Sequence, residues 1–105
     1  MDFLEYQAAA RETAIYPRAA AIVYPALGLA GEAGEVADKV KKVIRDGTKP
    51  DTHEQIVAEL GDVLWYVAVL AWDLGVDLET VAQRNLDKLA ARKAKGTLRG
   101  SGDKR

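Results

Sequence analysis

Apolar residues recur every three or four positions in two long stretches of the chain, which is the spacing of one face of an α-helix. In the first stretch, residues 26–45, the apolar stripe consists of Leu29, Ala33, Val36, Val40, Val43 and Ile44. In the second, which reaches about residue 74, it consists of Ile56, Leu60, Val63, Val67 and Leu70. Each stripe must face a buried surface, so the pattern predicts two amphipathic helices that pack against other helices.

Capping residues and helix breakers mark the ends of these helices and of two shorter ones. Asp2, with Glu5 three residues later, predicts a first helix to about residue 13, and Pro17 ends it. Two Tyr-Pro steps predict a partly irregular connector over residues 16–25. The remaining boundaries are Gly47 after the second helix, Asp51 or Thr52 before the third, Gly75 after it, and Asp77 before a fourth helix over residues 78–94.

The third predicted helix is apolar nearly all round between residues 63 and 72. A helix of that kind needs covering on most sides, and four short helices in one small chain can hardly do this. The sequence therefore predicts an all-α fold, a four-helix bundle that is completed by homo-oligomerisation. We expect a homodimer or a homotetramer with the third helix at its centre.

Length and composition favour one small helical domain. The chain has 105 residues, of which 49% are apolar and 7% aromatic, and it is too short for two domains. We expect the domain to cover residues 1–95 and a flexible, basic, glycine-rich tail to cover residues 96–105. The chain has no cysteine, which excludes disulfides and thiolate metal sites and leaves oxygen and imidazole as metal ligands.

Charge is distributed unevenly along the chain. Residues 1–83 carry 7 Lys and Arg against 14 Asp and Glu, whereas residues 84–105 carry 8 against 2. The basic end is compatible with a tail that binds nucleic acid, because cationic segments gain affinity by releasing counterions from phosphates. It is equally compatible with a segment that closes over a polyphosphate site.

Nothing in the sequence indicates export or membrane insertion. Asp2 and Glu5 stand where a secretory signal carries positive charge. The longest unbroken apolar run, residues 63–72, is half of the roughly 20 residues that a bilayer-spanning helix needs. We expect a water-soluble, cytoplasmic protein that does not associate with membranes.

Two pairs of carboxylates are the strongest candidates for chemistry: Glu32 with Glu35, and Glu59 with Asp62. Residues three apart on a helix project from the same side, and both pairs border an apolar stripe. If the two helices pack antiparallel, four carboxylates converge, and their mutual repulsion is relieved by a bound cation. Oxygen ligands favour hard ions, Mg²⁺ first and Mn²⁺ as a substitute.

Three glycines lie beside these carboxylates: Gly31, Gly34 and Gly61. Each interior glycine costs a helix roughly 1 kcal/mol relative to alanine. The sequence thus indicates that backbone, ion or ligand approaches closely at the acidic pairs. The alternative is an ordinary solvated acidic face that pairs with the lysines at positions 39, 41 and 42.

The segments AGEAGEV at residues 30–36 and ELGDVLWY at residues 59–66 resemble the E-x-x-E…E-x-x-D signature of the MazG-like all-α nucleoside triphosphate pyrophosphatases. The likeness extends from about Leu27 to the terminal GSGDKR, and so covers most of the chain. The superfamily also includes dimeric dUTPases, dCTP pyrophosphatases and phosphoribosyl-ATP pyrophosphohydrolases. The four carboxylates by themselves therefore do not identify the substrate.

The resemblance implies that Glu32, Glu35, Glu59 and Asp62 bind Mg²⁺, and that Glu35 also orients or deprotonates the attacking water. The implied reaction is hydrolysis between the α- and β-phosphates of a nucleoside triphosphate, which yields a nucleoside monophosphate and pyrophosphate. Such an activity serves sanitation of the nucleotide pool, often called house-cleaning.

Family members carry a set of Asn, Lys and Arg residues on the fourth helix that contacts phosphates. The matching residues in this sequence are Asn85, Lys88 and Arg92. The alternative for these three residues is a solvated basic face. Tyr66, one turn after Asp62, would line the base or sugar pocket, or it is ordinary core. Lys104 and Arg105 could fold over the phosphates of a bound nucleotide.

Two rival functions remain at this point. One keeps the enzyme but makes phosphoribosyl-ATP its substrate. The other is a non-catalytic helical module that binds a partner or nucleic acid through the basic end. Such a module needs no Mg²⁺, and the presence of both acidic pairs makes nucleic-acid binding the less favoured reading.

Overall fold

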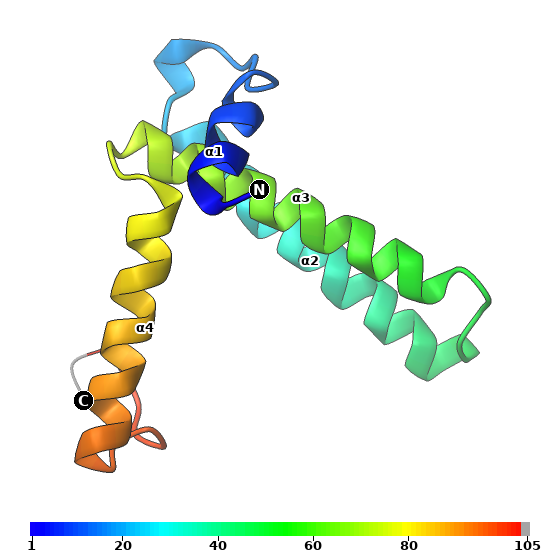
Figure 1. Ribbon diagram of the computed structural model, residues 1–105. Coiled ribbons are helices and arrows are strands. Elements are labelled where there is room, and N and C mark those ends of the chain that lie inside the picture. The colour runs from blue at the N-terminus through cyan, green and yellow to red at the C-terminus, as the bar shows by residue number, and fades with distance from the viewer. Residues whose placement is uncertain (104–105) are drawn as a thin grey trace.

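The computed structural model of the chain consists of four α-helices and one short 3-10 helix, and it describes residues 1–103. The elements are α1 (Phe3–Arg11), η1 (Arg18–Ala20), α2 (Val23–Asp46), α3 (Thr52–Asp73) and α4 (Leu78–Lys95) (Figure 1). No strand occurs among the described residues, so the all-α prediction is confirmed. Lys104 and Arg105, the end of the predicted tail, lie outside the described residues.

Helix α2 begins at Val23, three residues before the predicted start, so the connector is shorter than the sequence indicated. Pro25 falls in the first helical turn, where its missing N–H would have no partner within the helix anyway. Ile22 precedes the helix with φ 70° and ψ −56°, and the Val23 N–H donates to the Ala21 carbonyl over 2.8 Å. This is a γ-turn, a rare and strained conformation for a branched residue. The turn changes the chain direction between η1 and α2.

Helices α2 and α3 form a long antiparallel hairpin, and α4 diverges from it at a wide angle (Figure 1). Helix α1 packs on α3 and α4 where the hairpin meets α4, a region we call the junction. The radius of gyration is 16.5 Å, against about 13 Å for a compact chain of this length. A single chain is therefore an open, V-shaped arrangement in which the predicted four-helix bundle is not closed. Completion of the bundle by homo-oligomerisation stays a prediction.

The buried core lies at the junction and not along the hairpin. It contains Ala10, Tyr16, Ala68, Val69, Ala71 and Leu78. Gln7 is buried among them and uses its whole amide group. Its Nε2 donates to the carbonyls of Ala68 (3.0 Å) and Val76 (3.2 Å), while its Oε1 accepts from the Leu78 N–H (3.0 Å). One side chain of α1 therefore ties together α3, the turn after it and the start of α4.

Large apolar side chains remain exposed along the hairpin and on α4. Ile44 is 85% exposed and Leu27 70%, and Val57, Leu60 and Leu86 are also more than half exposed. By length and composition alone α3 could cross a membrane, a test that core helices of water-soluble proteins also pass. The predictions that this surface belongs to an oligomer and that the protein avoids membranes both stay predictions.

Asp73, the last residue of α3, fixes the connector to the junction. Its side chain is 1% exposed. It accepts hydrogen bonds from the Tyr16 hydroxyl (2.6 Å), from Arg18 Nη1 (3.0 Å) and from the backbone N–H of Ile22 (3.0 Å). The last of these bonds holds the residue at the centre of the strained γ-turn. Asp73 therefore stabilises the one backbone conformation here that local sequence would not choose.

Replacing Asp73 by asparagine should lower the free energy of unfolding by about 2 kcal/mol, because a buried charged acceptor of three hydrogen bonds is lost. Burial by itself would raise the pKa of Asp73, but the bonds from Ile22, Tyr16 and Arg18 outweigh it and lower the pKa. A lowered folded-state pKa gives stability that is present above the unfolded pKa of about 3.9 and is lost as the pH falls through the folded value.

Urea unfolding of both proteins at pH 7 and at about pH 3, at one fixed protein concentration, measures this difference. The difference in the free energy of unfolding between wild type and Asp73→Asn should be smaller at the lower pH. The matched control is Asp87→Asn, because Asp87 is exposed and accepts one bond, from Gln83 Nε2 at 2.8 Å. Equal effects of the two substitutions at pH 7 would contradict the role of Asp73.

Candidate metal centre

Three carboxylates from the two arms of the hairpin converge near its middle. Glu32 on α2 and Glu59 and Asp62 on α3 each offer an oxygen, and these oxygens all lie within 4.8 Å of one another. Glu59 and Asp62 are three residues apart and so share one side of α3. The antiparallel packing of α2 places Glu32 opposite them. We call these three residues the acidic cluster.

The acidic cluster is electrostatically unfavourable without a cation. The pKa of Glu32 is raised, first by a hydrogen bond with Glu59, then by desolvation, and then by the negative charges of Asp62, Glu59 and Glu35. Like charges that share a site favour the protonated form of one of them. A proton or a bound cation must therefore compensate the charge of this group.

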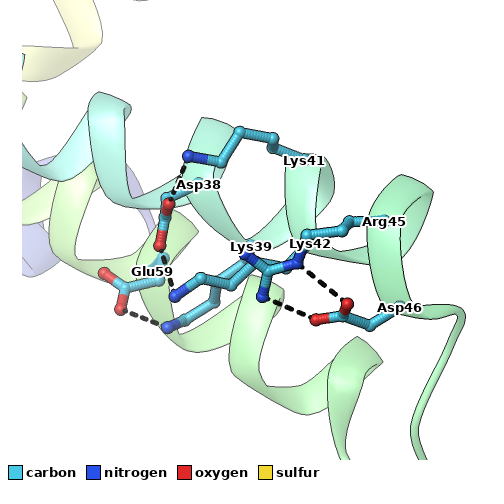
Figure 2. A network of polar contacts seen from close by, with 7 residues as sticks. All are labelled: Asp38, Lys39, Lys41, Lys42, Arg45, Asp46 and Glu59. Carbon is cyan, nitrogen blue, oxygen red and sulfur yellow. Dashed lines mark hydrogen bonds and ion pairs between the residues drawn. The ribbon is translucent and has the colours of Figure 1, made fainter.

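A hard divalent cation fits the donor atoms. The ligands are three carboxylates, Glu32 and Glu59 are half-buried and Asp62 is exposed, so the site is reached from solvent. Oxygen-only sites that are open to solvent suit Mg²⁺, which keeps several waters and takes ligand phosphates. The alternative interpretation, an acidic face that pairs with lysines, also holds in part, since Lys39 Nζ lies 3.5 Å from Glu59 Oε1 (Figure 2).

Glu35, the fourth predicted ligand, lies outside the group of three. It is exposed on α2 one turn after Glu32, and its charge contributes to the raised pKa of Glu32. It therefore stands at the rim of the acidic cluster. Its assignment as ligand and catalytic residue stays a prediction.

Tyr66 packs beside the acidic cluster as part of an aromatic row. Its ring lies 6.5 Å from that of Tyr24, which stacks on Tyr16 at 4.7 Å, and the indole of Trp65 meets it edge-on at 5.0 Å. Desolvation, followed by interactions with Tyr24 and the charges of Glu32 and Asp62, raises the pKa of the Tyr66 hydroxyl. The predicted role of Tyr66, in the base or sugar pocket or as ordinary core, stays a prediction.

The predicted phosphate-binding residues of α4 are not brought to the acidic cluster within one chain, because α4 diverges from the hairpin (Figure 1). Asn85 is exposed. Lys88 Nζ pairs with Asp103 Oδ1 at 3.0 Å, and Arg92 Nη2 donates to the Asp103 carbonyl at 2.9 Å. Arg92 is 5% exposed and its Nε has no hydrogen-bond partner among the described residues. Lys88 and Arg92 thus hold the last described residue of the tail.

One known protein family matches most of the chain. Residues 25–97, more than half of the chain and including all four carboxylates, match the MazG nucleotide pyrophosphohydrolase domain. The chain belongs to the MazG family. This MazG protein is also 53% identical over 109 aligned positions to the Gene 37 protein of Mycobacterium phage L5, with 95% of this chain and 96% of the phage protein covered. No solved structure matches it.

The close approach in this MazG domain occurs at Gly28 and not at the glycines that the sequence singled out. A Cβ placed at Gly28 would overlap the ring of Tyr66, so the bare backbone of α2 is what admits the ring. At Gly31, Gly34 and Gly61 an added Cβ meets nothing within 4 Å. Close approach of another part of the backbone at those three glycines is therefore not found among the described residues, and close approach of an ion or ligand there stays a prediction. Gly28 was missed because only the packing of α3 against α2 distinguishes it from its neighbours.

Gly28→Ala should destabilise the protein by about 1 to 3 kcal/mol, because the new methyl group forces the Tyr66 ring to move. Gly31→Ala is the matched control. It should leave stability unchanged or raise it by up to about 1 kcal/mol, since alanine is the better helix former and the site is open. Chemical denaturation of both variants measures the difference.

A second experiment tests whether the Tyr66 ring causes the loss of stability in Gly28→Ala. In a Tyr66→Ala protein the ring is absent, and Gly28→Ala should then behave like Gly31→Ala. A Gly28→Ala penalty that persists without the ring would contradict the proposed overlap.

Proposed function

We propose that this MazG protein hydrolyses nucleoside triphosphates to a nucleoside monophosphate and pyrophosphate in a Mg²⁺-dependent reaction. The observation that carries the proposal is the acidic cluster: three carboxylates of neighbouring helices within 4.8 Å, in a MazG domain. Sanitation of the nucleotide pool is the proposed role, with deoxynucleoside or non-canonical triphosphates as the substrate class.

The side chains suit such a reaction. Glu32, Glu59 and Asp62 would hold the ion, and a bound Mg²⁺ supplies positive charge that neutralises phosphate oxygens. Glu35, at the rim, would orient the water and accept its proton. The water oxygen forms a bond to the α-phosphorus, and the bond from that phosphorus to the oxygen bridging to the β-phosphate breaks. Pyrophosphate leaves with the bridging oxygen and its electron pair, so no covalent enzyme intermediate is required.

The working unit in this proposal is a homodimer or homotetramer. Exposed apolar residues on both arms of the hairpin support it, as does the open shape of the single chain. A second copy packed on the hairpin would cover that surface. It could also supply Asn85, Lys88 and Arg92, which a chain does not bring to its own acidic cluster.

Sedimentation velocity at micromolar concentration should give the mass of a dimer or tetramer. Leu60→Lys should shift it towards the monomer, because a charge at this half-exposed position on α3 would be buried in the interface. Ile15→Lys is the control, since Ile15 is 92% exposed in the connector, outside the hairpin. A wild-type monomer at this concentration would contradict the proposed assembly.

Asp62→Asn should lower the rate of pyrophosphate release by at least about 100-fold, because it removes one anionic ligand of the ion. The wild-type protein should release pyrophosphate and no orthophosphate, should need Mg²⁺, and should lose activity with a chelator. Asp87→Asn, an exposed carboxylate of α4, is the matched control and should keep full activity. Full activity of Asp62→Asn, with its helices intact by circular dichroism, would refute the metal assignment.

The same assay separates the rival functions. Phosphoribosyl-ATP as the preferred substrate would keep the reaction type and change the substrate. Turnover of no triphosphate at all, together with salt-dependent binding of DNA or RNA, would favour the non-catalytic module.

A further inference from the structure

A polar pocket lies at the end of the hairpin that is distant from the junction. Its volume is about 300 Å³, and it lies between the last turns of α2 and the first turn of α3. Four cationic side chains line it together with one acid, Asp46. The cations are Lys39, Lys42, Arg45 and Lys49.

This pocket concentrates the positive charge of an otherwise acidic region. Residues 1–83 contain seven Lys and Arg, and five of these lie within residues 39–49, where Asp46 is the one acidic residue. The charge therefore marks this end of the hairpin as a place that attracts anions.

Internal ion pairs neutralise the pocket only in part (Figure 2). Asp38 shares one carboxylate between Lys42 at 2.9 Å and Lys41 at 3.1 Å, and Arg45 pairs with Asp46 at 2.6 Å. Lys49 has no side-chain ion pair within residues 1–103. Exposed pairs of this kind contribute little to stability, so an anion of higher charge can exchange for them.

The pocket adjoins the acidic cluster through one residue. Lys39 lines the pocket, and its Nζ lies 3.5 Å from Oε1 of Glu59, a member of the cluster. Gln55, on the α3 wall of the pocket, precedes Glu59 by one helical turn, or about 6 Å. A cation site and an anion site thus lie side by side along the same pair of helices.

We propose that this pocket binds the terminal phosphates of the triphosphate substrate and the pyrophosphate released from it. The inference rests on the proposed function for the identity of the substrate. Lysine supplies compact point charges and arginine a planar fork, both suited to clustered phosphates. A nucleic-acid strand fits less well, because its phosphates are spread out and acids adjoin the pocket: Glu59 lies 3.5 Å from Lys39, and Asp51 accepts a hydrogen bond from Gln55 at 2.6 Å.

The test is an NMR titration of the full chain with inorganic pyrophosphate, in the presence of Mg²⁺ and again with a chelator. The backbone amides of Gly47, Lys49 and Thr52 should shift. Lys42→Ala should weaken binding about tenfold, the loss expected for one charge-assisted contact. Lys41→Ala is the matched control, because Lys41 pairs with the same Asp38 and carries the same charge but does not line the pocket.

Equal effects of Lys41→Ala and Lys42→Ala would overturn the proposal, as would amide shifts confined to α4 or no shifts at all. An oligonucleotide that binds at these amides where pyrophosphate does not would also overturn it. Circular dichroism of both variants checks that the helices are intact.

The readout is binding, so it is independent of turnover. Pyrophosphate binding at these amides in a protein that hydrolyses no triphosphate would support the pocket and refute the proposed function. A pyrophosphohydrolase whose KM for the triphosphate is equal in Lys41→Ala and Lys42→Ala would keep the function and refute the pocket.

Discussion

The antiparallel contact between α2 and α3 is the interaction on which the rest of the structure depends. It brings Glu32 across from Glu59 and Asp62, and it admits the ring of Tyr66 because α2 presents a glycine at position 28. The buried core contributes little along this contact, since it lies at the junction with α1 and α4. The position of the acidic cluster therefore follows from the packing of two amphipathic helices, whose partly buried stripes face each other.

The connector reinforces this contact from one end. Asp73 holds the γ-turn at Ile22, and that turn starts α2 next to the end of α3. The alignment of α2 along α3 is thereby set near the junction, while the loop after Gly47 connects the two helices at the far end. Both ends of the hairpin are fixed by polar and backbone interactions, and the carboxylates lie between them.

Much of the site could be predicted from the sequence because its signal is local. Carboxylates three apart on a helix share a side whatever the tertiary structure, and two such pairs on neighbouring helices needed one further assumption, antiparallel packing. Features that depend on contacts between distant residues could not be predicted. Gly28 looks like any other helix glycine until Tyr66, 38 residues later, lies against it, and Asp73 looks like a solvated helix end until Tyr16 and Ile22 reach it. The divergence of α4 was missed for a related reason, since capping residues predict where this helix begins and ends but not which helices it packs against.

A stability cost follows from crowding Glu32, Glu59 and Asp62, and it bears on protein engineering. Natural proteins commonly retain groups that weaken the fold where activity requires them. Directed evolution for heat resistance in chelating buffer would reward neutral side chains at these three positions, since they relieve repulsion that no ion is present to offset. Libraries screened in that way would become enriched in heat-stable variants without a metal centre. Thermostability alone would then be a misleading guide to catalytic activity.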